Sequence, residues 1–230
     1  MAVDVALVER ANATGDAFLR LYRFDPPCLS LGRNEAGGGY DRAAIARLGV
    51  DVVRRPTGGA AVWHEHEVTY AVAAPITAFG GLREAYHAIH TRLAAALRTL
   101  GADAALASDR QTAHPPDRPG PCFATPVGGE VLVRGRKVIG SAQARRCKAF
   151  LQHGSILLDG SQEKIRVVSR DPQVAGETTL AAALGRTVSF EEVVDAVVAA
   201  WDDDVTATAL RRPPPPSSAL FLDPAWTWRR

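Results

Sequence analysis

The sequence has few cysteines, few lysines and no long hydrophobic run. Its three cysteines are an odd number, and no basic stretch followed by an apolar one opens the chain, which argues against a secreted protein built on disulfides. No apolar stretch approaches the roughly 20 residues that a membrane-spanning helix needs. We therefore expect a protein of the reducing cytoplasm that does not cross a membrane.

The chain also lacks a strong charge of either sign. Lys and Arg number 27 and Asp and Glu number 25, so the net charge is +2, which disfavours a dedicated nucleic-acid binder. Only Lys137, Lys148 and Lys164 are lysines, so each of them is of interest. At 230 residues and 47% hydrophobic content, the chain is long enough for one domain with a full core and a short appendage.

The hydrophobic pattern alternates between helix and strand. Apolar residues at helical spacing predict helices over 1–14, 41–48 and 82–100, and a capping box of Ser189 and Glu192 predicts another that runs to Trp201. Strands are expected over 18–24, 28–31, 51–55, 60–63, 68–74, 131–133, 137–144 and 150–158. Four prolines at 213–216, followed by an apolar group at 220–228, are typical of a spacer that leads to a docking segment.

A glycine-containing turn follows two arginines in the first half of the chain. Arg54 and Arg55 precede Thr57-Gly58-Gly59-Ala60, whose backbone N–H groups suit an anionic or carbonyl oxygen. The alternative is an ordinary turn, for which paired glycines are common. In a strand His64 and His66 would share a face, but a third metal ligand is not evident, so a metal site is disfavoured.

Polar residues also interrupt two strands in the second half. Lys137 precedes Gly140-Ser141-Ala142-Gln143, whose small residues predict a groove beside the strand, although a solvated hairpin lysine is the alternative. His153-Gly154 breaks a second apolar strand, where a hydrogen-bonded core histidine is the alternative.

Cys122 is the strongest candidate nucleophile. It ends the proline-rich loop 109–121, and basic neighbours such as Lys137 lower the pKa of a thiol and raise its thiolate fraction. An inert, half-buried cysteine is the alternative. Cys147 lies between Arg146 and Lys148 and ranks second, whereas Cys28 is expected in the core.

Several blocks together resemble the superfamily of lipoate–protein ligase A, octanoyltransferases and biotin ligases. The blocks are Met1-Ala2-Val3-Asp4, Leu31-Gly32-Arg33-Asn34, residues 54–64, residues 135–143 and residues 151–158. The resemblance implies an α+β fold with mixed, largely antiparallel sheets flanked by helices. It covers residues 1–205 as a catalytic domain, leaves 206–230 as a proline-rich tail, and implies a further strand before residue 1.

Within that superfamily, residues 121–126 (Pro-Cys-Phe-Ala-Thr-Pro) resemble the Cys-Phe-x-x-Pro block of LipM-type octanoyltransferases. That likeness implies that Cys122 carries an octanoyl group from octanoyl-acyl-carrier protein to a lysine of a lipoyl domain, with Lys137 beside it. The family's block continues with a polar or aromatic residue and an acidic one, whereas Val127-Gly128-Gly129-Glu130 follows here.

The resemblance also implies the partners and the binding residues. Acceptors would be lipoyl-domain proteins such as the glycine cleavage H protein or dehydrogenase E2 subunits, with no cofactor, metal, nucleic acid or membrane involved. The expected substrate-binding residues are Arg54, Arg55, Thr57, Gly58, Gly59, Ala60, His64, Gly140, Ser141, Ala142, Gln143, His153 and Gly154. Basic residues of one hairpin beside the site would attract acidic carrier proteins or, alternatively, protect a strand edge; they are Arg134, Arg136, Arg145, Arg146 and Lys148.

Two other functions remain open from the sequence. In an ATP-dependent lipoate or octanoate ligase, which would need ATP and Mg²⁺, Lys137 and the glycine-containing turn would hold an acyl-adenylate and Cys122 would be a bystander. A binding protein without catalytic activity is the other alternative.

Overall fold

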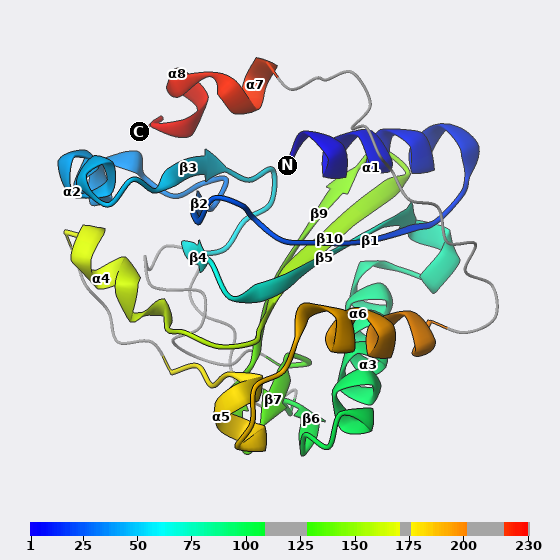
Figure 1. The fold of residues 1–230 in the computed structure, drawn as a ribbon. Helices are drawn as coiled ribbons and strands as arrows, with labels where there is room; N and C mark the ends of the chain where they lie inside the picture. The colour runs from blue at the N-terminus through cyan, green and yellow to red at the C-terminus, as the bar shows by residue number, and fades with distance from the viewer. Residues whose placement is uncertain (109–127, 171–175, 202–218, 230) are drawn as a thin grey trace.

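A four-stranded antiparallel sheet lies at the centre of the structure, a computed structural model that describes residues 1–108, 128–170, 176–201 and 219–229 (Figure 1). Its strand order is β1 (Phe18–Tyr22), β5 (Glu67–Pro75), β10 (Ala149–Leu157) and β9 (Ile139–Arg146). Helix α1 (Ala2–Thr14) covers one face, and α3 (Leu82–Thr99) and α6 (Phe190–Ala199) cover the other. No described helix is long and apolar enough to cross a membrane.

Strand β5 is buried along almost its whole length because both of its faces are covered. Tyr70 and Val72 point into the main core with α3 and α6, while the alternate residues Ala71 and Ala73 pack against Leu7 and its neighbours on α1. The small alanine side chains let α1 approach the sheet closely.

Two smaller three-stranded sheets flank the central one. In the first, β2 (Cys28–Leu31) pairs in parallel with β3 (Asp51–Arg54) and antiparallel with β4 (Val62–His64). The second is antiparallel and contains β6 (Ala104–Leu106), β7 (Val131–Val133) and β8 (Arg136–Lys137). Between β7 and β8, Arg134 and Gly135 both have positive φ, as the predicted two-residue hairpin turn requires.

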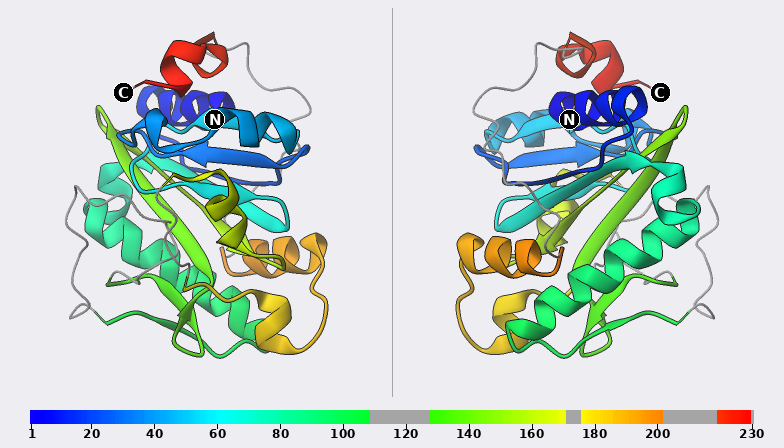
Figure 2. Two further views of the ribbon diagram at one scale, coloured as in Figure 1. Left: turned by 90° about the vertical axis from the view of Figure 1, so that its left-hand side faces the viewer. Right: turned by 90° about the vertical axis from the view of Figure 1, so that its right-hand side faces the viewer.

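Short helices connect these layers (Figure 2). They are η1 (Gly37–Gly39), α2 (Arg42–Arg47), η2 (Ile76–Phe79), η3 (Gln162–Lys164), α4 (Ile165–Val168), α5 (Leu180–Leu184), α7 (Ala219–Leu222) and α8 (Pro224–Thr227). Helices α7 and α8 lie against β3, and Trp228 packs on the apolar cluster that contains Leu29 and Leu31. The predicted docking segment therefore docks on its own chain.

The predicted fold class is confirmed, with two main changes in the strands: β6 was not predicted, and one predicted strand is divided between two sheets. The stretch 137–144 was expected to be one strand, but it changes sheet at the buried residue Val138. Lys137 pairs with Leu132 of β7, whereas Ile139 pairs with Ile156 of β10. The proline-rich loop 109–121, the prolines at 213–216 and the predicted domain boundary near residue 205 lie outside the described residues.

Candidate functional site

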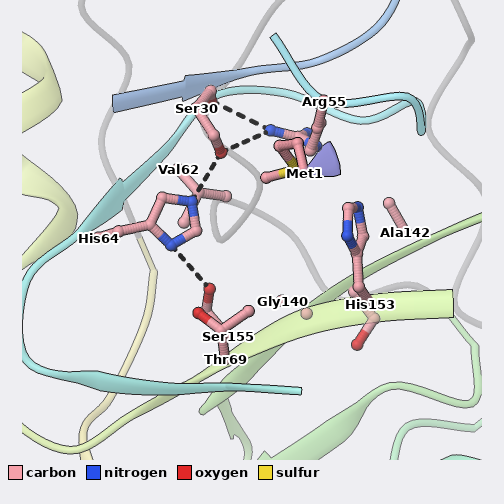
Figure 3. A pocket seen from close by; sticks show the side chains of 12 residues that line it. Met1, Ser30, Arg55, Val62, His64, Thr69, Gly140, Ala142, His153 and Ser155 are labelled. Carbon is pink, nitrogen blue, oxygen red and sulfur yellow. Dashed lines mark hydrogen bonds between the residues drawn. The ribbon is translucent and has the colours of Figure 1, made fainter. Parts of the chain in front are cut away.

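A pocket lies where the β3–β4 loop meets strands β9 and β10 of the central sheet (Figure 3). It is lined by Met1, Ser30, Arg55, Val62, His64, Thr69, Gly140, Ser141, Ala142, His153, Gly154 and Ser155. Small residues make this space. A Cβ atom at Gly154 would lie 2.4 Å from the carbonyl oxygen of Gly140, so only glycine fits there.

The glycine loop, residues 55–61, folds around the side chain of Arg55. This guanidinium donates hydrogen bonds to the carbonyl oxygens of Gly58 and Ala60 and to Ser30. Gly59 has a φ of +84°, which favours glycine. The loop also passes close to Gly32: a Cβ atom on Gly32 would lie 1.7 Å from the carbonyl oxygen of Gly59. The predicted glycine-containing turn is therefore a tightly held element beside the pocket.

A buried chain of hydrogen bonds joins α1 to the glycine loop. His153 lies 3.2 Å from Asp4 through Nδ1 and 2.6 Å from the Thr57 hydroxyl through Nε2. Burial by itself raises the pKa of Asp4, but the hydrogen bond with His153 and nearby positive charges such as Arg20 outweigh it, so this pKa lies well below its usual value. Burial lowers the pKa of His153. A neutral ring that donates to Asp4 must accept from Thr57.

A second chain of the same kind crosses the opposite wall. His64 Nδ1 lies 2.5 Å from Oε1 of Glu67, and His64 Nε2 lies 2.7 Å from the hydroxyl of Ser30. Figure 3 shows the series continuing from Ser30 to Arg55, and on the other side of the ring to Ser155. Oε2 of Glu67 is buried and has no hydrogen-bond partner among the described residues.

Lys137 is buried in an ion pair with Glu130. Its Nζ lies 2.6 Å from Oε1 of Glu130, and the two residues are 2% and 3% exposed. The alternative of a solvated hairpin lysine is therefore wrong. Lys137 stands at the end of β8, three residues before the pocket residue Gly140, and is not among the pocket-lining residues named above.

A third polar cluster supports the pocket from the α3 side. The hydroxyl of Ser141 lies 2.8 Å from Nε2 of His90 and 2.7 Å from the hydroxyl of Tyr70. Nδ1 of His90 lies 2.7 Å from the carbonyl oxygen of Gly129, next to Glu130 in the sequence. Burial lowers the pKa of His90 to about 4, so the ring is neutral at neutral pH and donates to Gly129.

The structure divides the predicted binding residues into two groups. Arg55, His64, Gly140, Ser141, Ala142, His153 and Gly154 line the pocket. The other residues lie behind the pocket. Thr57 contacts His153, and the carbonyl oxygens of Gly58 and Ala60 accept hydrogen bonds from Arg55, with Gly59 between them. The side chain of Gln143 donates hydrogen bonds to Leu82 and Gln152. Arg54 is fully buried, with its N–H groups directed at backbone carbonyl oxygens. Roles of all these residues toward a substrate stay predictions.

The three cysteines have different surroundings. Cys122 lies outside the described residues. Cys28 is buried in β2 as predicted, and burial raises the pKa of its thiol to about 12, which makes it a poor nucleophile. Cys147 is exposed in the β9–β10 turn and is not among the residues that line the pocket.

One prediction about the surface is wrong, and one condition for a metal site is not met. His64 and His66 do not lie in one strand, because β4 ends at His64 and His66 lies exposed in the turn before β5. The five basic residues do not form one cluster: Arg134 and Arg136 flank the β7–β8 turn, whereas 145–148 lie at the far end of β9. The eight residues of that strand separate them by roughly 26 Å at the usual rise. The described residues hold no group of three or more potential metal ligands.

Sequence reasoning missed the partners of the histidines and of the lysine. Asp4 lies in the first of the blocks that carry the family resemblance, and Glu67 lies three residues after another, but nothing local marks them as partners of His153 and His64. Glu130 lies seven residues before Lys137 on the opposite arm of the hairpin, and pairing the arms by the turn would have brought them together. His90 carried no signal beyond its place on a helix.

This fold and pocket define a catalytic domain. The model of the lipoyl protein ligase A/B catalytic domain matches residues 1–202, so the chain belongs to that family, as the resemblance predicted. The chain is 39% identical over 219 residues to octanoyltransferase LipM of Symbiobacterium thermophilum, an alignment that covers 87% of this chain and 80% of the relative. It is 43% identical over 182 residues to octanoyltransferase LipM of Kyrpidia tusciae, covering 75% of this chain and 66% of the relative, just under two thirds.

Among solved structures, lipoate-protein ligase A bound with ATP superposes with a TM-score of 0.72 at 20% identity, covering 86% of this chain and 76% of that one. At this identity the likeness establishes the fold alone.

Proposed function

We propose that this chain is an octanoyltransferase of protein lipoylation. It moves an octanoyl group from octanoyl-acyl-carrier protein, through a thioester on Cys122, to a lysine of a lipoyl domain. The observation that carries the proposal is the 35–43% identity to several octanoyltransferases named LipM, over 69–87% of this chain. The ATP-dependent ligase is less favoured, because the curated relatives at 35–43% identity are octanoyltransferases.

The pocket suits an alkyl chain although polar residues line much of it. The His153 and His64 rings are each tied at both nitrogens to side chains of the protein. Polar groups that are already hydrogen-bonded lose little when water is displaced from in front of them. We place the octanoyl chain between the glycine loop and β9–β10; the free space there is about 20 Å³, so the pocket must widen to admit the chain.

The reaction is two acyl transfers in sequence. The Cys122 thiolate attacks the thioester carbonyl of the donor, a bond from carbon to the Cys122 sulfur forms, and the carrier thiol leaves and takes a proton. The neutral amine of the acceptor lysine then attacks the enzyme thioester, the bond from carbon to the Cys122 sulfur breaks, and Cys122 leaves as the thiolate while the nitrogen gives its extra proton to a base as the amide forms. Both steps exchange one acyl bond for another, so neither consumes ATP.

Lys137 is buried at the end of β8, two residues before β9 begins, and its charge is the second element of the proposed site. Its ion pair with Glu130 fixes the ammonium group at the start of β9, where its charge favours both the thiolate of Cys122 and the oxyanion of the tetrahedral intermediate. Backbone N–H groups of the glycine loop are the second set of donors for that oxyanion.

His153 is suited to accept the proton of the incoming lysine. Its ring is neutral because burial lowers its pKa, and Asp4 holds the tautomer in which Nε2 accepts. That nitrogen lies 2.6 Å from the Thr57 hydroxyl, which is buried behind the pocket and serves as the relay for the proton in this proposal. The donor and the lipoyl-domain acceptors named above, and the cytoplasmic location, belong to the same proposal.

The deciding experiment mixes the protein with octanoyl-acyl-carrier protein alone, without ATP, and measures the intact mass. We expect an octanoyl adduct that Cys122→Ser abolishes and that the matched control Cys147→Ser retains. Addition of a lipoyl domain should then discharge the adduct and octanoylate the acceptor. Modification of the acceptor that requires ATP and free acid, without an adduct, would establish the ligase instead.

A further inference from the structure

The C-terminal segment, residues 219–229, lies beyond the part of the chain that the family model matches. It folds into α7 and α8 and lies against β3, the strand that leads into the glycine loop (Figure 1). Trp228 packs on the cluster of Leu29 and Leu31, and the guanidinium of Arg42 lies 4.3 Å from its ring centre. The segment is thus a packed part of the pocket's outer layer.

Backbone carbonyl groups of this segment hold the side chain of Arg54. Nε of Arg54 donates to the carbonyl oxygens of Trp226 at 3.0 Å and Thr227 at 3.1 Å, and the indole of Trp226 donates back to the Arg54 carbonyl at 3.1 Å. Arg54 is 0% exposed. A buried guanidinium needs such acceptors, because burial without them is costly.

The other end of the same guanidinium reaches the pocket's supporting loop. Nη1 of Arg54 donates to the carbonyl oxygens of Gly32 at 2.5 Å and Glu35 at 2.6 Å. Residues 32–35 in turn contact the glycine loop: Arg33 N donates to the carbonyl oxygen of Thr57, and a carboxylate oxygen of Glu35 accepts from the backbone of Ala61. One buried side chain therefore connects the C-terminal segment to the loop that borders the acyl pocket.

We propose that the C-terminal segment is a built-in positioning element for the glycine loop and that it acts through Arg54. The segment supplies the carbonyl oxygens that fix the guanidinium, the guanidinium fixes residues 32–35, and these residues fix the backbone of the glycine loop. Without the segment, Arg54 loses the acceptors of its Nε and turns toward solvent, and the loop loses its outer support. A test of this proposal by enzyme activity rests on the proposed octanoyl transfer, whereas a test by hydrogen–deuterium exchange does not.

The primary test is hydrogen–deuterium exchange on the full chain and on a variant that ends at Ser218. The reporters are the backbone amides of Arg33 and Arg55, which donate to the carbonyl oxygens of Thr57 and Leu31. We expect both amides to exchange at least tenfold faster in the shortened protein, with α3 unchanged. A synthetic peptide of residues 219–230, added in trans, should restore slow exchange in a saturable way, and a peptide with Trp226→Ala should not.

The activity arm measures transfer from octanoyl-acyl-carrier protein. The shortened protein should show a KM for the donor raised about tenfold, and the peptide should restore it. The full-length variant Arg54→Lys should show the same defect without rescue by the peptide, because one ammonium group cannot serve both sets of carbonyl oxygens. Leu222→Ala, at a side chain that is 79% exposed on the same segment, is the matched control and should behave as wild type.

The possible results distinguish failure of the positioning role from failure of the proposed octanoyl transfer. If the wild-type protein transfers no octanoyl group but the exchange rates change as described, the positioning role stands and the proposed function fails. Unchanged exchange at Arg33 and Arg55 in a folded shortened protein overturns the positioning role. If the shortened protein does not fold, the full-length double variant Trp226→Ala/Trp228→Ala takes its place, with the same expectations and the same refuting result.

Discussion

Protonation of His90 should make the stability of this protein depend on pH in a calculable way. The buried ring has a pKa of about 4 in the folded protein, against 6.5 for an ordinary histidine. Burial is the main cause, and the charge of Lys137 acts in the same direction. A lowered pKa means that the unfolded chain binds the proton more readily, so this residue reduces stability as the pH falls from about 6.5 towards 4.

The size of the effect follows from the two pKa values. A shift of about 2.5 units corresponds to about 3.4 kcal/mol when the loss is complete, below pH 4. Between pH 7 and pH 5 the same linkage relation gives a loss of about 1.8 kcal/mol in the free energy of unfolding. Other titrating groups, His153 included, contribute in the same pH range, so the comparison needs a variant that lacks only this titration.

The assay is urea unfolding of the wild type and of His90→Gln at pH 7 and pH 5. Glutamine does not titrate, and it keeps a donor and an acceptor for Gly129 and Ser141. The wild type should lose about 1.8 kcal/mol more than the variant between the two pH values. Equal losses in the two proteins, within about 0.3 kcal/mol, would refute the argument that burial holds this ring neutral.

Two further substitutions test the geometry of the site. Glu130→Gln leaves the buried charge of Lys137 without its carboxylate and should cost about 3 kcal/mol in urea unfolding; adding Lys137→Met should recover most of that stability but none of the transfer activity, and recovered activity would remove the lysine from the mechanism. Gly32→Ala should displace the glycine loop and destabilise the protein by at least about 2 kcal/mol, because its Cβ would lie 1.7 Å from the Gly59 carbonyl oxygen. The control is Gly58→Ala, whose Cβ meets nothing within 4 Å and which should cost under about 1 kcal/mol. Equal shifts of the melting temperature in the two variants would contradict the observed close approach.

Local patterns predicted the elements of this fold well where one physical rule decided them. The capping box at Ser189 and Glu192 starts α6, and the turn at Arg134-Gly135 has the left-handed backbone that such a hairpin needs. The strand through Val138 was different. The chain stays extended through Val138, and Lys137 and Ile139 on either side are both buried, so nothing local marks the point where the hydrogen-bonding partners change.

The neighbouring residues in the sequence identified the pocket residues but not the carboxylates that bind them. His153 stood out because polar residues interrupt an apolar strand there, and His64 because it ends a block that resembles the family. The carboxylates that orient them depend on tertiary packing: Asp4 lies 149 positions from His153 and reaches it only because α1 lies on the face of β10. Spacing along the chain carries no information about such a contact.

Assembly of the pocket is therefore coupled to assembly of the whole domain. One carboxylate–imidazole–hydroxyl chain needs α1, β10 and the glycine loop in place, and the other needs β2, β4 and β5. A histidine whose carboxylate is missing is free to adopt the other tautomer, which reverses its hydrogen bond to the hydroxyl of Thr57 or Ser30 and loosens the chain. A partly folded domain thus lacks the ordered lining of the proposed acyl site. Under the proposed function, acyl binding selects the fully packed domain, so substitutions at Asp4 or Glu67, neither of which lines the pocket, should weaken acyl binding as well as the fold.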